Sequence, residues 1–146
     1  MTENQKVKRM LGAMLRIPFQ AIVARINEGL RMREFTDLRP AHFAVFQHIR
    51  PEGSSITELA EQAQITKQSM GSLVDHMVAC GYVESLPDPN DGRAKIVRLT
   101  DRGWNLDNAA REILSQIEQE WAEQLGDERM TQLKQTLNDL IILIER

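Results

Sequence analysis

The chain has 146 residues, of which 42% are hydrophobic and 27% charged, a composition that suits one globular domain or subunit and excludes a disordered tail. Its single cysteine excludes an internal disulfide framework and is typical of a reducing cytoplasm. Charged residues interrupt the first twenty positions, and the longest apolar run, 140–144, is too short to span a bilayer. We therefore expect a cytoplasmic protein without a membrane segment.

The net charge of −3 is unevenly distributed along the chain. Residues 1–53 carry nine Lys or Arg against five Asp or Glu, whereas residues 104–146 carry four against nine. Two windows contain no carboxylate: 65–74, which includes Lys67, and 92–100, which includes three basic residues. Local basic windows on an acidic protein can still meet phosphate, so the net charge does not exclude a nucleic-acid partner.

The first two predicted elements are helices. Apolar residues at helical spacing predict a long amphipathic helix over Lys6–Gly29, in which Pro18 should cause a kink or a break. Arg39-Pro40 opens a second helix, because proline is favoured in the first helical turn, and residues 51–53 end it.

Two short helices with a tight connection come next. Ser55 and Glu58 have the spacing of a capping box at the start of a helix with an apolar stripe. After a connection at residues 64–65, Thr66 is a suitable N-cap for a second helix that stops at Gly81. This arrangement is typical of a helix-turn-helix.

A turn-rich run separates two short strands. Two prolines and a glycine within residues 87–92 exclude a helix there, and the flanking residues predict a hairpin of Tyr82–Leu86 and Ala94–Leu99. A helix-turn-helix followed by a hairpin is a winged helix. The predicted fold class is therefore mainly α with a small β-hairpin wing.

Two helices complete the chain. Thr100 caps a long helix over Asp101–Leu125, and a last helix covers Glu128–Glu145. The last helix carries a wide apolar stripe of Met130, Leu133, Leu137, Leu140, Ile141 and Ile144. The remaining chain offers little to cover this stripe, so we expect it at an interface between subunits.

This order of elements, together with the hairpin motif, resembles the MarR family of bacterial transcriptional regulators. The family pattern is Asp-Pro-x-Asp-x-Arg, a strand ending in Leu-Thr, and a glycine three positions later. It is matched here by Asp88, Pro89, Asp91, Arg93, Leu99, Thr100 and Gly103. The segment 57–85 also resembles the helix-turn-helix of the family, with Leu59, Ala60, Leu73, Val74, Gly81 and Val83 in the expected places.

The resemblance implies a winged helix-turn-helix with an N-terminal dimerisation helix (1–38), a DNA-binding domain (39–100) and C-terminal dimerisation helices (101–146). It further implies a homodimer that binds a pseudo-palindromic operator in double-stranded DNA, usually as a repressor released by a small molecule or by thiol oxidation. Composition and spacing alone lead only to a dimeric winged-helix DNA binder. No nucleophile–base pair, phosphate-binding glycine loop or metal cluster is evident, so we expect neither an enzyme nor a cofactor.

The predicted DNA-binding residues lie on the second helix of the pair and on the wing. They are Thr66, Lys67, Gln68, Ser69, Ser72, Arg93 and Lys95. Glutamine can bond adenine, serine can reach bases or phosphate, and lysine takes phosphate or guanine. Arg93 should reach the flanking minor groove, and Asp91 should fix the wing by bonding to the arginine or to turn amides. Gly71 either allows a close approach to DNA or to the wing, or is a tolerated helix glycine.

The histidines and four aromatic side chains have both a functional and a structural interpretation. The histidines (His42, His48 and His76) and the one cysteine give a metal site few ligands, so such a site is disfavoured. Four aromatic side chains either line a pocket for a small aromatic or apolar effector, which relatives form between the winged helix and the dimer region, or pack in the core, the more frequent role. They are Phe19, Phe43, Phe46 and Trp104.

Two alternative functions remain open. A winged helix can bind protein in place of DNA, and the net acidity supports that alternative. A thiol-based redox sensor would depend on Cys80. We favour a packing role for Cys80, because the peroxide-sensing members of the family carry their cysteine in the first helix, which has none here.

Overall fold

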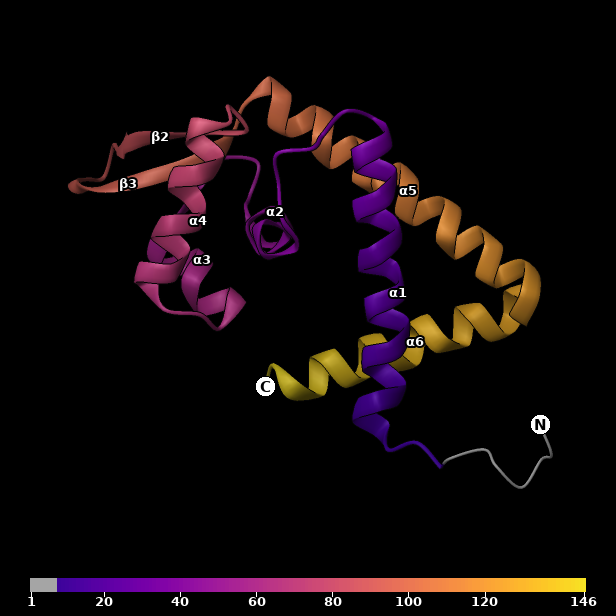
Figure 1. Ribbon diagram of the computed structural model, residues 1–146. Helices are drawn as coiled ribbons and strands as arrows, with labels where there is room; N and C mark the ends of the chain where they lie inside the picture. The colour runs from indigo at the N-terminus through magenta and orange to yellow at the C-terminus, as the bar shows by residue number, and fades with distance from the viewer. Residues whose placement is uncertain (1–7) are drawn as a thin grey trace. The chain divides into compact units, whose positions relative to one another are not determined.

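The computed structural model describes residues 8–146 and is mainly helical, with a small antiparallel sheet (Figure 1). It divides into two compact units, one ending at Ala110 and the other running from Arg111 to Arg146. Its elements are α1 (Leu11–Met32), the 3-10 turn η2 (Pro40–His42), α2 (Phe43–His48), β1 (Ser54–Ser55), α3 (Ile56–Ala63), α4 (Lys67–Ala79), β2 (Val83–Asp88), β3 (Asp91–Leu99), α5 (Asp101–Leu125) and α6 (Asp127–Ile144). Within the described residues, no helix combines the length and the apolar character needed to cross a membrane.

Helix α1 differs from its prediction at both ends and in the middle. The predicted start at Lys6 lies outside the described residues, and the helix runs from Leu11 to Met32, past the predicted end at Gly29. Pro18 lies inside the helix, which continues through it, so the predicted break is wrong. Proline has no backbone N–H, so the helix loses one hydrogen bond at Pro18. A helix of 22 residues keeps enough backbone hydrogen bonds on either side to remain continuous.

The second predicted helix begins where Arg39-Pro40 indicated, but as a single 3-10 turn. Arg39 is extended at the N-cap position, and Pro40 occupies the first position of η2. The chain then continues into α2, which ends at His48. Proline suits this first turn because its φ is already near the helical value and its missing N–H would have no helical partner there.

Strand β1 was not predicted. Ser54 and Ser55 pair with β3, so the sheet has three strands in the order β1–β3–β2. Two serines are too short a segment to show the alternation by which strands are recognised. Gly53 makes the pairing possible, because it has a φ of 108° and a Cβ there would overlap the side chain of Ile96.

The turn between α3 and α4 follows the predicted cap chemistry. The Ser55 hydroxyl accepts the N–H of Glu58 at 3.1 Å, which confirms the N-cap half of the capping box. The Glu58 carboxylate forms an ion pair with Arg50 at 2.7 Å. Gln64 ends α3 in the left-handed conformation (φ 57°), and Thr66 begins α4 two residues later as its N-cap.

Helix α4 ends as its sequence indicates. Gly81 has a φ of 81°, and the N–H of Tyr82 reaches back to the carbonyl of Met77 at 2.9 Å. This is the hydrogen bond of a Schellman motif, which turns the chain sharply out of the helix and into β2. In Figure 1, α3 and α4 lie side by side and the β2–β3 hairpin extends away from them. The fold is therefore a winged helix-turn-helix.

The wing, defined here as β2 and β3 with their turn, is longer than predicted. Both strands continue into the turn-rich run and leave a two-residue tip at Pro89-Asn90. Pro87 pairs with Lys95 and Asp88 with Asp91, so residues 92–94 of β3 form a bulge without partners on β2.

The core of the first unit gathers between α2, α3, α4 and the root of the wing. Its largest fully buried side chains include Val45, Leu59, Met70, Val74, Met77, Tyr82, Val83, Val97 and Leu106. The buried residues of α4, Met70, Val74 and Met77, repeat every three or four positions, which places them on one face of the helix. The opposite face of α4 is left exposed.

The second unit consists of the rest of α5 and α6, joined at Gly126, which has a φ of 96°. The ends of α6 lie within one residue of the prediction. Lys134 and Glu118 form an ion pair between the two helices at 2.9 Å. The end of α6, Ile141 to Ile144, is exposed in the single chain.

We expect Gly103→Ala to lower the free energy of unfolding by about 1–3 kcal/mol, because the new methyl group would overlap the carbonyl oxygen of Tyr82. Gly71→Ala is the matched control, since nothing lies within 4 Å of its added carbon. That variant should gain about 0.5–1 kcal/mol from its better helix propensity. Chemical denaturation of both variants tests this, and equal stabilities would contradict it.

Candidate nucleic-acid interface

The first turn of α4 is organised by a hydroxyl pair. Thr66 Oγ1 accepts the N–H of Ser69 at 3.0 Å and donates its own proton to Ser69 Oγ at 2.8 Å. A hydroxyl can do both at once. Thr66 thus caps the helix, its hydroxyl holds the side chain of Ser69, and Ser69 Oγ keeps its own proton for a further acceptor; both residues are predicted to bind DNA.

All five predicted residues of this segment are exposed, namely Thr66, Lys67, Gln68, Ser69 and Ser72. Gln68 and Ser72 are four residues apart and therefore lie on the same face of the helix, one turn from each other. Asp75 is the next residue on that face, so a carboxylate marks its far end. The surface free of carboxylates is thus the first two turns of α4.

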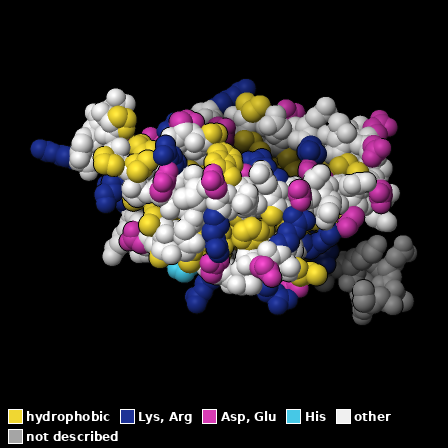
Figure 2. Space-filling model, turned by 90° about the horizontal axis from the view of Figure 1, so that it is seen from above, with side chains coloured by type: hydrophobic (Ala, Val, Ile, Leu, Met, Phe, Trp, Pro, Cys, Tyr) yellow, Lys and Arg dark blue, Asp and Glu magenta, His cyan; other side chains and the backbone are white. Residues whose placement is uncertain are grey.

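The wing brings Arg93 and Lys95 together on its outer part, and both are exposed. Arg93 is the middle residue of the bulge, and its backbone N–H donates to Asp91 Oδ1 at 3.1 Å. Asp88 Oδ1 accepts the N–H of Asn90 at 2.9 Å in the same way. Two carboxylates thus bind backbone amides of the tip, and Figure 2 shows basic side chains projecting at this end of the molecule.

An ion pair between Arg98 and Glu84 joins the two strands at the root of the wing. Arg98 and Glu84 are opposite each other in the register, and their side chains meet at 2.5 Å. A glutamate on the partner strand therefore compensates the third basic residue of the window 92–100. The positive charge available at the wing is that of Arg93 and Lys95.

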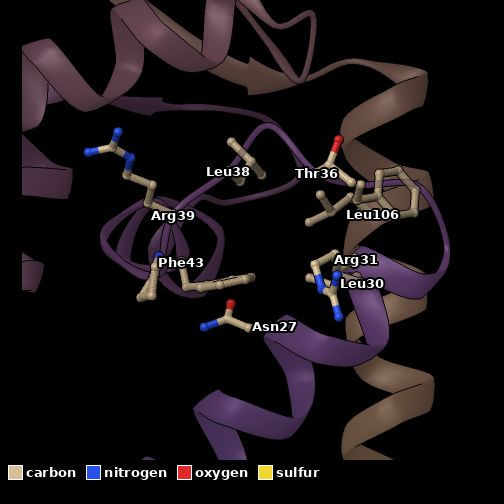
Figure 3. Close-up of a pocket in the computed structure, with 10 residues that line it drawn as sticks. Asn27, Leu30, Arg31, Thr36, Leu38, Arg39, Phe43 and Leu106 are labelled. Carbon is tan, nitrogen blue, oxygen red and sulfur yellow. The ribbon is translucent and has the colours of Figure 1, made fainter.

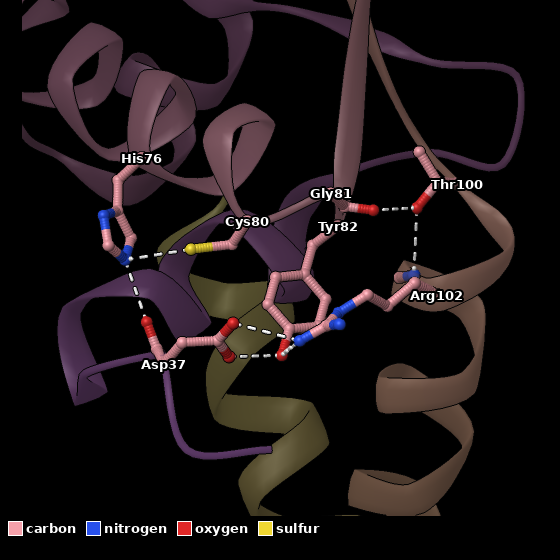
Figure 4. Close-up of polar contacts among 8 residues, drawn as sticks. Asp37, His76, Cys80, Gly81, Tyr82, Thr100 and Arg102 are labelled. Atoms are coloured by element: carbon pink, nitrogen blue, oxygen red, sulfur yellow. Dashed lines mark hydrogen bonds and ion pairs between the residues drawn. The ribbon is translucent and has the colours of Figure 1, made fainter. Parts of the chain in front are cut away.

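A polar cluster that was not predicted, made of Asp37, Tyr82 and Arg102, lies beside the C-terminal end of α4 (Figure 4). The Tyr82 hydroxyl donates to Asp37 at 2.5 Å and accepts from Arg102 at 2.9 Å, and Arg102 also bonds Asp37 at 3.0 Å. The guanidinium carbon of Arg102 is 4.5 Å from the centre of the Tyr82 ring. The three residues are 20 to 65 positions apart, so no local pattern could indicate them.

The charges in this cluster shift the pKa values of its members. Burial raises the pKa of the Asp37 carboxyl, but the Tyr82 hydrogen bond and the charge of Arg102 outweigh burial, so the net pKa lies below its usual 3.8. Burial and the Asp37 hydrogen bond raise the pKa of Tyr82 above its usual 10.0. The cluster is therefore a tyrosine hydroxyl between a carboxylate and a guanidinium at neutral pH.

Cys80 and His76 lie at the edge of the same cluster. Cys80 is half-buried, with its Sγ 3.5 Å from His76 Nε2. Burial and the nearby Asp37 carboxylate raise the pKa of this thiol above its usual 9.0, which disfavours the thiolate that redox chemistry requires. Among residues 8–146, no group of three or more His, Cys, Asp or Glu is placed to hold a metal ion.

A pocket of about 220 Å³ lies within the first unit, between the end of α1, the following loop and the start of α5. Its lining includes Leu30, Phe35, Leu38, Phe43 and Leu106. Phe43 and Leu38 point into the space, whereas the guanidinium of Arg39 points away from it (Figure 3). Of the other predicted pocket aromatics, Phe46 is buried in the core, and Phe19 and Trp104 are exposed.

Arg31 also lines this pocket. Its guanidinium is held by both oxygens of Glu28, at 2.7 and 2.9 Å. This pair lowers the pKa of Glu28 and raises that of Arg31, chiefly through the hydrogen bonds between them. The pocket is thus a mostly apolar space with one compensated cation at its rim.

Comparison with known proteins matches this architecture to one family. A model described as "MarR family" matches residues 36–94. The chain is 28% identical over 123 residues to the transcriptional activatory protein BadR of Rhodopseudomonas palustris, which covers 80% of this chain and 68% of the relative. It is 29% identical over 108 residues to the multiple antibiotic resistance protein MarR of Escherichia coli, covering 72% and 74%.

Solved structures agree with the sequence matches. The reduced form of MarR from E. coli has a TM-score of 0.77 at 26% identity and covers 92% of this chain and 98% of its own. A mutant MarR from E. coli complexed with operator DNA has a TM-score of 0.71 at 26% identity, with coverage of 89% and 92%.

The winged helix-turn-helix, with an exposed polar face on its second helix and a basic wing, defines a class of transcriptional regulators. The chain is similar to the MarR family of that class, whose model matches residues 36–94.

We expect Tyr82→Phe to lower the free energy of unfolding at neutral pH by about 1–2 kcal/mol, because Asp37 loses a hydrogen bond in its charged form. A carboxylate whose pKa is depressed on folding stabilises the protein above its unfolded pKa, and this stability is lost as the pH falls through the folded pKa. The difference between the two proteins should therefore shrink below the usual pKa of 3.8. Urea titrations from pH 7 to pH 2 measure it, and a constant difference would contradict the assignment.

Proposed function

We propose that this chain is a MarR-type regulator that binds a pseudo-palindromic operator in double-stranded DNA as a homodimer. In each half-site α4 would enter the major groove, and the wing would reach the flanking minor groove. The observation that carries the proposal is the surface free of carboxylates formed by the first two turns of α4, beside a wing with two exposed basic residues. The operator complex of the E. coli relative supports it.

Different side chains at the start of α4 would contact the bases and the phosphate backbone. Gln68 and Ser72 share one face and have amide and hydroxyl groups, which can bond to base edges. Lys67 comes directly before Gln68, and its positive charge would bind a phosphate of the DNA backbone. Thr66 and Ser69 hold each other at the helix start, so they would meet the backbone of the DNA through the remaining hydroxyl capacity.

The wing would contribute affinity more than sequence readout. Arg93 lies at the bulge, where the backbone is held by Asp91, and Lys95 is two residues further along the same strand. A guanidinium is attracted by the negative potential of a narrow minor groove. The Asp91 carboxylate is engaged by the amide of Arg93, so it would shape the wing and not repel DNA.

The parts of the chain outside the winged helix would form the dimer. We assign residues 1–38 and 101–146 to dimerisation and 39–100 to DNA binding. Exposed apolar side chains support this assignment on α1 (Leu11, Met14, Leu15, Ile17, Phe19) and on α6 (Leu133, Ile141, Ile142, Leu143, Ile144). Contiguous apolar surface of this kind is normally covered by another subunit.

The regulator would act as a repressor that a small aromatic or apolar effector releases. The pocket lined by Phe43, Leu38 and Leu106 supports this part of the proposal, because it has room for a small molecule and is mostly apolar. Its wall includes the loop that carries Asp37, and Asp37 contacts the residues at the end of α4. An occupant would therefore touch a segment that also holds the recognition helix.

The test uses a duplex that the chain itself selects from a random pool at pH 7.5. Gln68→Ala should weaken binding to this duplex by about 1–3 kcal/mol with little loss on random DNA, because a bidentate contact to a base is removed. Arg93→Ala should weaken binding to both DNAs and lower the slope of log affinity against log salt by about one. Asp91→Ala should also weaken binding, although it removes a negative charge.

Matched controls separate these effects from loss of structure or of charge alone. Gln119→Ala changes an exposed glutamine of α5, and Arg129→Ala removes a positive charge from α6. Neither should change the selectivity or the salt slope. Failure to select any duplex, with a folded protein, would favour the alternative of a winged helix that binds protein.

The dimer is tested by sedimentation equilibrium. We expect a dimer at micromolar concentration and a shift toward monomer in Ile144→Glu, because a charge in a buried interface costs several kcal/mol. Gln135→Glu introduces the same charge on an exposed position of α6 and should leave the dimer intact. A folded wild-type monomer at these concentrations would overturn the assignment.

A further inference from the structure

Two aspartates of the wing tip hold the backbone in the same way. Asp88 Oδ1 accepts the N–H of Asn90 at 2.9 Å, and Asp91 Oδ1 accepts the N–H of Arg93 at 3.1 Å. Each is an Asx turn, in which a carboxylate bonds to the amide two residues further on. Such a turn folds the carboxyl group back over the intervening peptide bond, so its carbon lies close to the nitrogen of the next residue.

The residue after each aspartate decides whether that nitrogen can react. Pro89 follows Asp88, and a proline nitrogen has no proton to give up. Gly92 follows Asp91, and its nitrogen does carry a proton; Asp91-Gly92 is the one Asp-Gly step in the sequence. The two turns are therefore a matched pair, in which the second alone can form a new covalent bond.

The surroundings of Asp91-Gly92 leave this peptide bond open to reaction. Both residues are exposed, and a Cβ added at Gly92 would meet no atom within 4 Å. Gly92 belongs to the bulge at residues 92–94, which has no partners on β2, and the tip extends away from α3 and α4 (Figure 1). Glycine also has the greatest backbone freedom of any residue. The backbone can therefore adapt to a five-membered ring.

We propose that Asp91-Gly92 is a site of spontaneous isomerisation, at which aspartate converts to isoaspartate and the wing loses a contact with DNA. The part of the proposal that concerns DNA rests on the function proposed above. In the first step the nitrogen of Gly92 attacks Cγ of Asp91. The Cγ–N bond forms, the Cγ–OH bond of the carboxylic acid form breaks, and the hydroxyl leaves with the amide proton as water. The product is a cyclic imide.

Hydrolysis then opens the imide in one of two directions. Water that adds at Cγ restores aspartate. Water that adds at the former main-chain carbonyl of Asp91 breaks its bond to the nitrogen of Gly92, so the main chain afterwards runs through Cγ and the new carboxylate is attached to Cα. One water is lost and one is gained. The mass and the charge of the chain therefore stay the same, and the reaction needs no oxidant and no enzyme.

Isoaspartate changes the geometry that positions Arg93. The main chain gains one carbon before Gly92, and the carboxylate loses the methylene group through which it now reaches the N–H of Arg93. The Asx turn is lost in this form, and Arg93, the next residue after Gly92, moves with the longer backbone. Because the negative charge is unchanged, the expected loss of DNA affinity comes from geometry.

The chemical step is measured without DNA. The full chain is kept at 37 °C and pH 7.5, and isoaspartate is detected by peptide mapping and by methylation with a protein isoaspartyl methyltransferase. We expect isoaspartate to accumulate at Asp91 and not at Asp88. Gly92→Ala should slow the accumulation severalfold, because a methyl group beside the attacking nitrogen hinders its approach. Gly92 is not in the left-handed conformation and has open space around it, so alanine fits there.

The consequence for the wing is measured on the selected duplex and on random DNA. Aged wild type should bind both more weakly, in proportion to its isoaspartate, and full conversion should lower the slope of log affinity against log salt by about one. Arg93→Ala should show no further change of slope on ageing, since its contact is already missing. Gly92→Ala, aged in parallel, should keep the affinity of its own fresh sample.

Each part of the proposal can fail by itself. Absence of isoaspartate at Asp91 in the folded wild type, or equal accumulation in Gly92→Ala, overturns the isomerisation site. Isoaspartate at Asp91 with unchanged DNA affinity overturns its effect on the wing. Failure of fresh wild type to select any duplex overturns the proposed function and leaves the chemical result standing.

Discussion

The burial of Tyr82 is the constraint on which the rest of the first unit depends. Its side chain has no solvent exposure, so its hydroxyl needs polar partners, and Asp37, from the loop before η2, and Arg102, from α5, supply them. Its backbone N–H donates to the carbonyl of Met77 at the end of α4, and its carbonyl oxygen accepts the N–H of Thr100 at 3.1 Å. One residue thus sets where the recognition helix ends, where the wing begins and where α5 departs.

The features that depend on neighbouring residues could be predicted from the sequence. The N-caps at Ser55 and Thr66 and the left-handed Gly81 each follow from one or two side chains acting on nearby backbone. The same holds for the exposed residues of α4, because helical period alone assigns Met70 to the core and Gln68 to the surface. The wing strands were placed correctly but ended too early, since the prolines and Gly92 were interpreted as turn residues only.

The features that depend on residues distant in sequence could not be predicted. Strand β1 exists because two serines meet β3 across more than forty residues. The contact between Asp37 and Tyr82 spans 45 positions, and the stacked rings of His42 and His76 also join separate elements. Neither has a periodic or spacing signal, so the support behind the recognition helix became visible only in three dimensions. Pro18 differs from these cases, because a local rule indicated a kink or a break there, and the helix continues through the proline without a break.

The bulge at residues 92–94 separates the geometry of the wing tip from that of its root. Because the shift in register is absorbed there, the pairs from Val83–Leu99 to Pro87–Lys95 do not depend on how many residues form the tip. An insertion or deletion at Pro89-Asn90 would change the reach of the wing without rotating Val97 out of the core. The length of the outer wing can therefore change while the paired root of the wing and its buried residues keep their positions.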